Sequence, residues 1–274
     1  MNSVNLSGKW LVTYSENSFE KSSVLPDFQD GILIDAVPGY WEDMCDKFAM
    51  APFWKNVVFN PEYRPVTFPI LGNVPDMVLE TIVGTFFYKR EISPVVTSGK
   101  KIILKCAGVQ NRVLLFINGV FTGEHAGYSA PFEFDVTEFL SGEKNNEIIL
   151  AVSNHQAKNE NGDMISGCTS RAANRFTGGI MGDVVLEIKN ESCILDAWVS
   201  SWDEKSDSFT VNTELSCDSQ FEIVCEILEN GKALKTLRAA SSVFSFERGE
   251  LDFWSPAAPT LYTASLTLFV GGEL

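Results

Sequence analysis

Short segments in which apolar residues alternate with polar ones, or gather in brief apolar runs, dominate the chain, and helical periodicity is nearly absent. β-Branched and aromatic residues fill these segments, and Gly, Pro, Asn and Asp separate them. One short helix fits residues 41–56, with Trp41, Cys45, Phe48 and Ala49 on one face. In the N-terminal part the predicted strands are residues 10–14, 31–37, 85–92, 101–106, 112–117, 132–136, 147–153 and 183–189. The pattern predicts an all-β fold.

The clearest local signal is a hairpin turn at Asn118-Gly119, with an apolar strand at 113–117 before it and a short strand at 120–122 after it. Asn-Gly favours a tight turn because both residues tolerate positive φ. We expect a loop of small residues to follow. His125 would lie in this loop and make a structural hydrogen bond, since no G-x-S-x-G motif supports a nucleophilic triad.

Residues 132–136 alternate with the period of a strand, so Phe132 and Phe134 are predicted to face the core. Glu133 and Asp135 would share the opposite face. Such a pair could serve as acid and base, but the alternation favours a solvated strand face.

A second series of strands begins near residue 190 and contains another Asn-Gly turn, Asn230-Gly231. Its predicted strands are residues 195–201, 208–216, 220–228, 232–239, 242–247 and 262–269. Short strands at this spacing are typical of an immunoglobulin-like sandwich. We therefore divide the chain into a first domain, 1–189, and a second, 190–274.

The alternation at 262–270 meets Gly271-Gly272, a turn signal, and the sequence stops two residues later. A hairpin turn without a returning strand leaves an open sheet edge. We expect the second domain to be truncated at this edge, in a fragment of a longer protein or a natural truncation.

The composition and net charge limit the classes of partner that the chain could bind. The net charge is −15 and the pI is near 4.6, which argues against nucleic acids and anionic membranes. No apolar run is long enough to span a membrane, and the N-terminus lacks the features of a signal peptide. The compartment stays open, with the cytoplasm favoured.

No metal site or cofactor is predicted. The two histidines, His125 and His155, lie far from any cysteine pair, and the cysteines form no C-x-x-C motif, so we expect free thiols. The stretch 159–163 (Asn-Glu-Asn-Gly-Asp) offers oxygen ligands for Ca²⁺, but it lacks the full spacing of a known loop, and a polar turn is the favoured interpretation.

Six segments in the same order resemble glycoside hydrolase family 2. They are 6–10 (Leu-Ser-Gly-Lys-Trp), 37–43 (Val-Pro-Gly-Tyr-Trp-Glu-Asp), 84–92, the stretch 112–137 that contains the hairpin, 177–184 (Thr-Gly-Gly-Ile-Met-Gly-Asp-Val) and 254–262 (Trp-Ser-Pro-Ala-Ala-Pro-Thr-Leu-Tyr). The resemblance implies a jelly-roll sugar-binding domain followed by an immunoglobulin-like domain. In that family a (β/α)₈ barrel follows and supplies two catalytic glutamates. A barrel needs about 250 further residues, so we expect no catalytic residue in this chain.

The resemblance also implies that the loop before Gly178-Gly179 reaches toward the sugar pocket. The family often has an aspartate there, whose place falls near Ala173, and this sequence departs from that pattern. Arg171, Asn174 and Arg175 are the candidate substrate-binding residues. The two arginines would suit an anionic sugar, although packing at a domain interface is the favoured alternative.

Aromatic residues gather around the predicted helix and the proline-rich stretch 52–75. They are Trp41, Phe53, Trp54, Phe59 and Tyr63. Such rings stack on sugars, but large aromatics more often anchor a core or an interface. The leading hypothesis is a non-catalytic N-terminal portion of a family 2 exo-glycosidase acting on β-galactoside-, β-glucuronide- or β-mannoside-like substrates. This portion would scaffold the barrel and contribute a loop to the pocket. The rival is a stand-alone carbohydrate-binding module.

Overall fold

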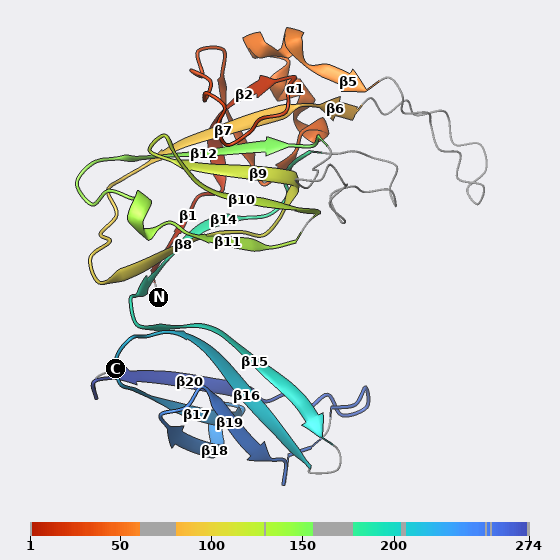
Figure 1. Ribbon diagram of the computed structural model, residues 1–274. Coiled ribbons are helices and arrows are strands. Elements are labelled where there is room, and N and C mark those ends of the chain that lie inside the picture. The colour runs from red at the N-terminus through yellow and green to blue at the C-terminus, as the bar shows by residue number, and fades with distance from the viewer. Residues whose placement is uncertain are drawn as a thin grey trace, which may run out of the picture. The chain divides into compact units, whose positions relative to one another are not determined.

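The computed structural model describes residues 2–60, 81–128, 130–155, 178–203, 207–249, 251–252 and 254–272. It divides into two compact units, Met1–Ile188 and Lys189–Leu274, and each is built almost entirely from strands (Figure 1). The predicted all-β fold, one β-sandwich followed by a second, is confirmed. Asn118 and Asn230 both have positive φ, of 52° and 48°, so both predicted Asn-Gly hairpin turns form.

The first unit is a sandwich of an eight-stranded and a four-stranded sheet (Figure 1). The larger sheet has the order β3-β2-β7-β12-β9-β13-β4, with β10 also paired to β9, and the smaller sheet has the order β1-β14-β8-β11. A short ribbon pairs β5 with β6. The strands are β1 Asn2–Asn5, β2 Gly8–Ser15, β3 Ile32–Val37, β4 Gly39–Tyr40, β5 Val58–Asn60, β6 Thr81–Val83, β7 Thr85–Ile92, β8 Lys100–Cys106, β9 Val109–Ile117, β10 Val120–Tyr128, β11 Phe132–Asp135, β12 Asn146–Ser153, β13 Gly179–Ile180 and β14 Val184–Asn190.

The main core lies between these two sheets, and a smaller cluster covers the outer face of the larger sheet. Both faces of β9 and β12 are therefore buried, which explains why these strands read as continuous apolar runs. Trp10, Trp41 and Tyr88 are among the largest fully buried side chains of the main core.

The predicted short helix is confirmed in a broken form: η1 Glu42–Met44, α1 Cys45–Phe48 and η2 Pro52–Asn56, with η3 Thr137–Phe139 further along the chain. Trp41 and Phe48 are buried as expected, but Ala49 is exposed, so its predicted place on the buried face is wrong. Met44 is buried instead, because the 3₁₀ turn at the start changes the angular spacing of the side chains.

The loop of small residues predicted after the 120–122 strand is wrong, because β10 continues through this region and pairs with β9 as far as Tyr128. A Cβ atom on Gly123 would lie 2.5 Å from the ring of Phe134, so a small residue is required there by packing. His125 consequently lies within a strand, and its ring stacks on Phe132 with centroids 4.3 Å apart. Burial lowers the pKa of His125. Among the described residues its Nε2 has no hydrogen-bond partner, so the expected structural hydrogen bond is not found at this atom.

The second unit is a smaller sandwich of two three-stranded sheets, β15-β16-β19 and β18-β17-β20. Its strands are β15 Cys193–Asp203, β16 Ser208–Ser216, β17 Phe221–Glu229, β18 Lys232–Ala239, β19 Val243–Glu247 and β20 Thr263–Val270. Buried apolar residues from both sheets, such as Val211, Ile223 and Phe244, form its core.

Two further findings concern the described residues only. Cys45, Cys106, Cys193, Cys217 and Cys225 are free thiols, as expected, while Cys168 lies outside the described residues. Within the same ranges, no helix has the length and apolar character needed to cross a membrane.

Candidate functional site

The candidate site is one rim of the larger sheet. At this rim the chain leaves the sheet before residue 156 and returns to it after residue 177, at the two ends of the segment 156–177. Gln110 of β9 pairs with Tyr128 of β10 and with Gly179 of β13, and Arg112 pairs with Ala126 of β10 and with Ser153 of β12. A strand has one neighbour on each side. Both β12 and β13 therefore lie on the side of β9 opposite β10, and the segment leaves and re-enters the sheet at neighbouring positions.

The predicted substrate-binding residues Arg171, Asn174 and Arg175 lie in this segment, outside the described residues. The polar stretch 159–163 lies outside them as well. The structure thus describes the base that carries the candidate loop, on both sides, but not the three residues themselves.

The returning end of the segment is tightly packed. The backbone N–H of Trp41 donates to the carbonyl of Gly178 at 3.0 Å, and a Cβ atom on Gly178 would lie 2.2 Å from the Trp41 ring. Gly179 has a φ of +133°, and a Cβ atom there would lie 2.3 Å from the carbonyl oxygen of Gly39. Two motifs that are far apart in the sequence, at 37–43 and 177–184, therefore form a single base in which both glycines are required.

The ring of Trp41 is itself held in place. Its Nε1–H donates to the hydroxyl of Tyr88 at 2.8 Å, and both side chains are fully buried. Burial raises the pKa of Tyr88, which keeps its hydroxyl neutral and able to accept this hydrogen bond. Next to Trp41, Tyr40 of β4 is 40% exposed, and it is the exposed large aromatic side chain among the described residues of the first unit.

The departing end of the segment is fixed by Asn154, which follows β12. Its Nδ2 donates to the carbonyl of Ile82 at 2.6 Å, its Oδ1 accepts from the N–H of Gly84 at 3.1 Å, and its carbonyl accepts from Nδ2 of Asn111 at 3.4 Å. Asn111 is fully buried, and among the described residues its Oδ1 has no hydrogen-bond partner. Sequence reasoning missed Asn111 and Asn154. The signal was the polar run Gln-Asn-Arg at 110–112 inside an otherwise apolar strand.

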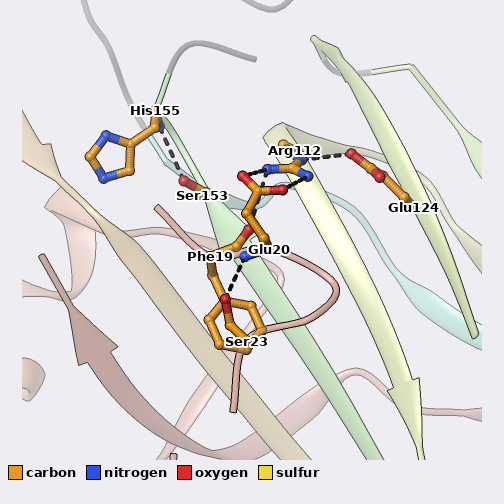
Figure 2. Close-up of polar contacts among 7 residues, drawn as sticks. All are labelled: Phe19, Glu20, Ser23, Arg112, Glu124, Ser153 and His155. Carbon is orange, nitrogen blue, oxygen red and sulfur yellow. Dashed lines mark hydrogen bonds and ion pairs between the residues drawn. The ribbon is translucent and has the colours of Figure 1, made fainter. Parts of the chain in front are cut away.

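Arg112 lies at the same end, on the outer face of the larger sheet, and its side chain is only 16% exposed. Figure 2 shows its guanidinium between Glu20 and Glu124. Nη1 and Nη2 donate to the two carboxylate oxygens of Glu20 at 2.9 and 2.8 Å, and Nε donates to Glu124 at 2.6 Å. The hydrogen bonds from Arg112 hold the pKa of Glu20 below its ordinary value, and those to Glu20 raise the pKa of Arg112. Nη1 also donates to the carbonyl of Phe19 at 3.3 Å.

These contacts fasten residues 16–31, which we call the strap, across the outer face of the larger sheet. Phe19 packs edge-on against Phe87 and Phe116, with centroids 4.7 and 5.9 Å apart, and Phe28 belongs to the same buried cluster. His155 lies 3.0 Å through Nε2 from the carbonyl of Glu16. The strap therefore covers the apolar part of this sheet face.

The outer face of the smaller sheet carries charged pairs. Lys105 lies 3.4 Å from Glu133 and 3.1 Å from Glu187, and Lys101 lies 3.4 Å from Asp135. Glu133 and Asp135 are exposed, which confirms the predicted solvated face, and each forms an ion pair with a lysine.

Of the five aromatic residues predicted to anchor a core or an interface, the structure describes the side chains of three. Trp41 and Phe53 belong to the main core, which confirms that interpretation for both. Trp54 is half-buried against the same core. The side chain of Phe59 and all of Tyr63 lie outside what the structure describes.

The chain is thus a two-domain β-protein. A large two-layer sandwich is followed along the chain by a small immunoglobulin-like sandwich. Residues 4–189 match the sugar-binding domain of glycosyl hydrolases family 2, and the chain belongs to that family. A β-galactosidase of Clostridium acetobutylicum is 27% identical over 277 residues, which cover 94% of this chain and 28% of that enzyme. A β-glucuronidase of Bacteroides fragilis is 31% identical over 140 residues, covering 48% of this chain and 18% of that enzyme.

Solved structures share the fold. The β-glucuronidase of Bacteroides uniformis superposes with a TM-score of 0.65 at 20% identity, covering 98% of this chain and 30% of that chain. A β-glucuronidase from an uncultured Clostridium species gives a TM-score of 0.64 at 18% identity, covering 99% and 43%. The chain spans about a quarter of the length of the first curated relatives it matches, at 25% and 28%.

Proposed function

We propose that this chain is the non-catalytic N-terminal part of a family 2 exo-glycosidase, in which it scaffolds a catalytic barrel and contributes one loop to the sugar pocket. The observation that carries the proposal is the base of the segment 156–177, where both ends are held at one rim of the sheet by Asn154 and by Gly178-Gly179. A loop that approaches a sugar needs such a rigid support, because a small displacement of a binding group weakens its hydrogen bonds.

Arg171, Asn174 and Arg175 are the proposed sugar contacts. The amide of Asn174 can donate to and accept from hydroxyl groups, and the guanidinium groups can bind a carboxylate through paired hydrogen bonds. The named relatives act on β-galactosides and β-glucuronides. Two arginines on one loop favour the glucuronide, whose carboxylate is the feature that a galactoside lacks.

The covered sheet faces support the fragment over the stand-alone binding module. A jelly-roll module that binds sugar on a sheet face needs aromatic rings open to solvent on that face. Here the strap covers the apolar part of the larger sheet's outer face, and lysine–carboxylate pairs occupy that of the smaller sheet. The exposed Tyr40 is the remaining aromatic candidate, and it lies at the rim.

The first test is an assay of the purified 274-residue chain on a panel of nitrophenyl β-glycosides. We expect no turnover above the blank, because hydrolysis with retention needs an acid/base and a nucleophile that the proposal assigns to the barrel. Turnover that disappears when a residue of this chain is mutated would overturn the proposal.

The second test is an NMR titration of the same chain with glucuronate and with galactose. We expect dissociation constants in the millimolar range or weaker, since each hydrogen bond to a hydrated loop contributes only about 1 kcal/mol. Glucuronate should shift the side-chain Nε signals of Arg171 and Arg175, and Arg175→Met should remove part of this response.

Two outcomes of the titration favour the binding module instead. Micromolar affinity for a simple sugar would do so, because a pocket completed by a barrel should bind weakly without it. Binding that survives Asn174→Ala and Arg175→Ala but is lost in Tyr40→Ala or Trp54→Ala would place the site on the aromatic residues.

A further inference from the structure

A pocket of about 490 Å³ lies in the first unit, and both sheets of the sandwich line it. The larger sheet contributes the end of β7, and the smaller sheet contributes β1, the end of β14 and the start of β8. The rim that carries the candidate loop is at the other end of β7, where Thr85 pairs with Ser153, about 23 Å away along the strand. The volume is within the range of about 300–1,000 Å³ that is usual for small-molecule sites.

Most of the lining is aliphatic. Val4 shows that the space beside it is open: it pairs with the fully buried Leu186, so its side chain points to the interior, yet it is 39% exposed. An apolar ligand that covers this lining would remove its surface from water, which is favourable. The aliphatic side chains include those of Val4, Leu6, Ile92, Val95, Val96 and Ile188.

The inner wall of the pocket carries a cation, Arg90 of β7. Arg90 pairs with the fully buried Ile148, so its side chain points between the sheets. Nη1 donates to the carbonyls of Leu6 and Ser7 at 2.5 and 3.0 Å, and the guanidinium carbon lies 5.8 Å from the centroid of the Trp10 ring. These contacts hold the guanidinium through Nη1 and one ring, while Nε and Nη2 have no hydrogen-bond partner among the described residues.

Arg90 also differs from the other arginines that the structure describes, because within the same ranges no carboxylate lies within ion-pair distance of it. Glu91 is the carboxylate among the lining residues, but its side chain is on the opposite face of the sheet, since successive strand residues alternate. Lys100 adds a second cation to the lining, in a chain whose net charge is −15. The other described arginines each pair with a carboxylate: Arg112, Arg238 and Arg248.

We propose that this pocket binds a small aliphatic carboxylate, whose oxygens accept hydrogen bonds from Nε and Nη2 of Arg90 while its chain lies against Val4 and Ile188. Nε and Nη2 form one edge of the planar guanidinium, and this edge matches the two oxygens of a carboxylate. The aliphatic lining requires a chain, and the arginine without an ion pair requires an anion. A ligand that has only one of these two features therefore binds weakly.

The test is an NMR titration of the full 274-residue chain with hexanoate, and with acetate and 1-hexanol for comparison. Hexanoate should shift the backbone amide signals of residues 4, 92–96 and 188 and the side-chain Nε signal of Arg90. Its dissociation constant should be at least tenfold lower than that of acetate, which lacks the chain, and that of 1-hexanol, which lacks the charge.

Variants at Val4 test the charge without touching Arg90. Val4→Glu places a carboxylate on the wall of the pocket and should weaken hexanoate binding at least tenfold, while Val4→Lys should leave it unchanged or strengthen it. Val24→Glu, at a 92% exposed position of the strap outside the pocket, is the matched control and should bind like the wild type. Circular dichroism on each variant reports whether the fold is retained.

A variant of the arginine itself tests the paired hydrogen bonds. Arg90→Lys keeps the positive charge but loses the planar fork, so it should weaken the binding of hexanoate and leave that of 1-hexanol unchanged.

Three results would overturn the proposal. The first is a titration in which hexanoate shifts no signal of the pocket residues. The second is equal affinity for hexanoate and 1-hexanol, because Arg90 would then not recognise the carboxylate. The third is hexanoate binding that Val4→Glu leaves unchanged in a folded variant, or that Val24→Glu weakens equally.

Discussion

Replacing Gly179 by alanine should destabilise the first unit strongly, because this position joins the candidate loop to the sheet. The residue has a φ of +133°, and a Cβ atom built there lies 2.3 Å from the carbonyl oxygen of Gly39. That oxygen belongs to the backbone of β4, which pairs with β13 and cannot move alone. The alanine must therefore either shift β4 or break the pairing that anchors the returning end of the segment.

The magnitude follows from two contributions. A non-glycine residue in such a sparsely populated region of φ costs about 1–3 kcal/mol. Forcing an extra carbon into a packed site costs about 1–3 kcal/mol more. The sum, roughly 4 kcal/mol, is a large part of a typical domain stability of about 5–15 kcal/mol.

The measurement is urea unfolding followed by tryptophan fluorescence, fitted with a separate transition for each unit. With a slope of about 2 kcal/mol per molar urea, the midpoint of the first unit should fall by about 2 M, and that of the second unit should not move. Gly119→Ala is the matched control: φ is +79° and no atom lies within 4 Å of the added carbon, so about 1–2 kcal/mol is expected from the backbone alone. Equal midpoint shifts for the two variants would refute the steric argument.

Further predictions concern the strap and the buried thiols. Arg112→Met should cost about 1–2 kcal/mol at pH 7, because it removes the charge-assisted hydrogen bonds that a largely buried guanidinium donates. Arg112 lowers the pKa of Glu20, so this stabilisation is present above the ordinary value of 4.5 and is lost as the pH falls through the folded-state pKa. The difference between the urea midpoints of wild type and variant should shrink accordingly, and a constant difference down to about pH 3 would contradict the role of Glu20. Burial raises the pKa of Cys106 and Cys225 to about 11, so neither should be alkylated at pH 8 until urea unfolds the chain. Peptide mapping after brief alkylation distinguishes them from the other thiols, and rapid modification of Cys106 or Cys225 in the folded protein would count against this.

The strands could be predicted because the information lies in neighbouring residues. The expected strands at 85–92, 208–216 and 232–239 have the observed bounds of β7, β16 and β18. Period-two alternation, β-branched residues and Asn-Gly turns each act over a few positions. The strands that were missed, such as β4 and β13, have only two residues, so they carry no readable period and exist because each pairs with a distant partner.

The candidate site was only partly accessible to the same reasoning. The sequence pointed to the segment before Gly178-Gly179, but not to the residues that hold its base. Asn154 bonds to Ile82, Gly84 and Asn111, which are 72, 70 and 43 positions away in the chain. Contacts between residues so far apart in the chain produce no periodic pattern in the sequence. A buried asparagine such as Asn154 therefore cannot be distinguished from an asparagine in a turn.

The sequence alone determined the class of fold, the positions of most strands along the chain and the family, because alternation, turn chemistry and ordered motifs are properties of the linear chain. Tertiary structure decided which small residues form a loop and which are required by close packing. Gly123 lies in a strand because the ring of Phe134 covers it, and the position of Glu20 depends on Arg112, 92 residues further on. The reason is physical: strand formation is favoured by local backbone and side-chain preferences, whereas burial and pairing depend on which distant surfaces meet.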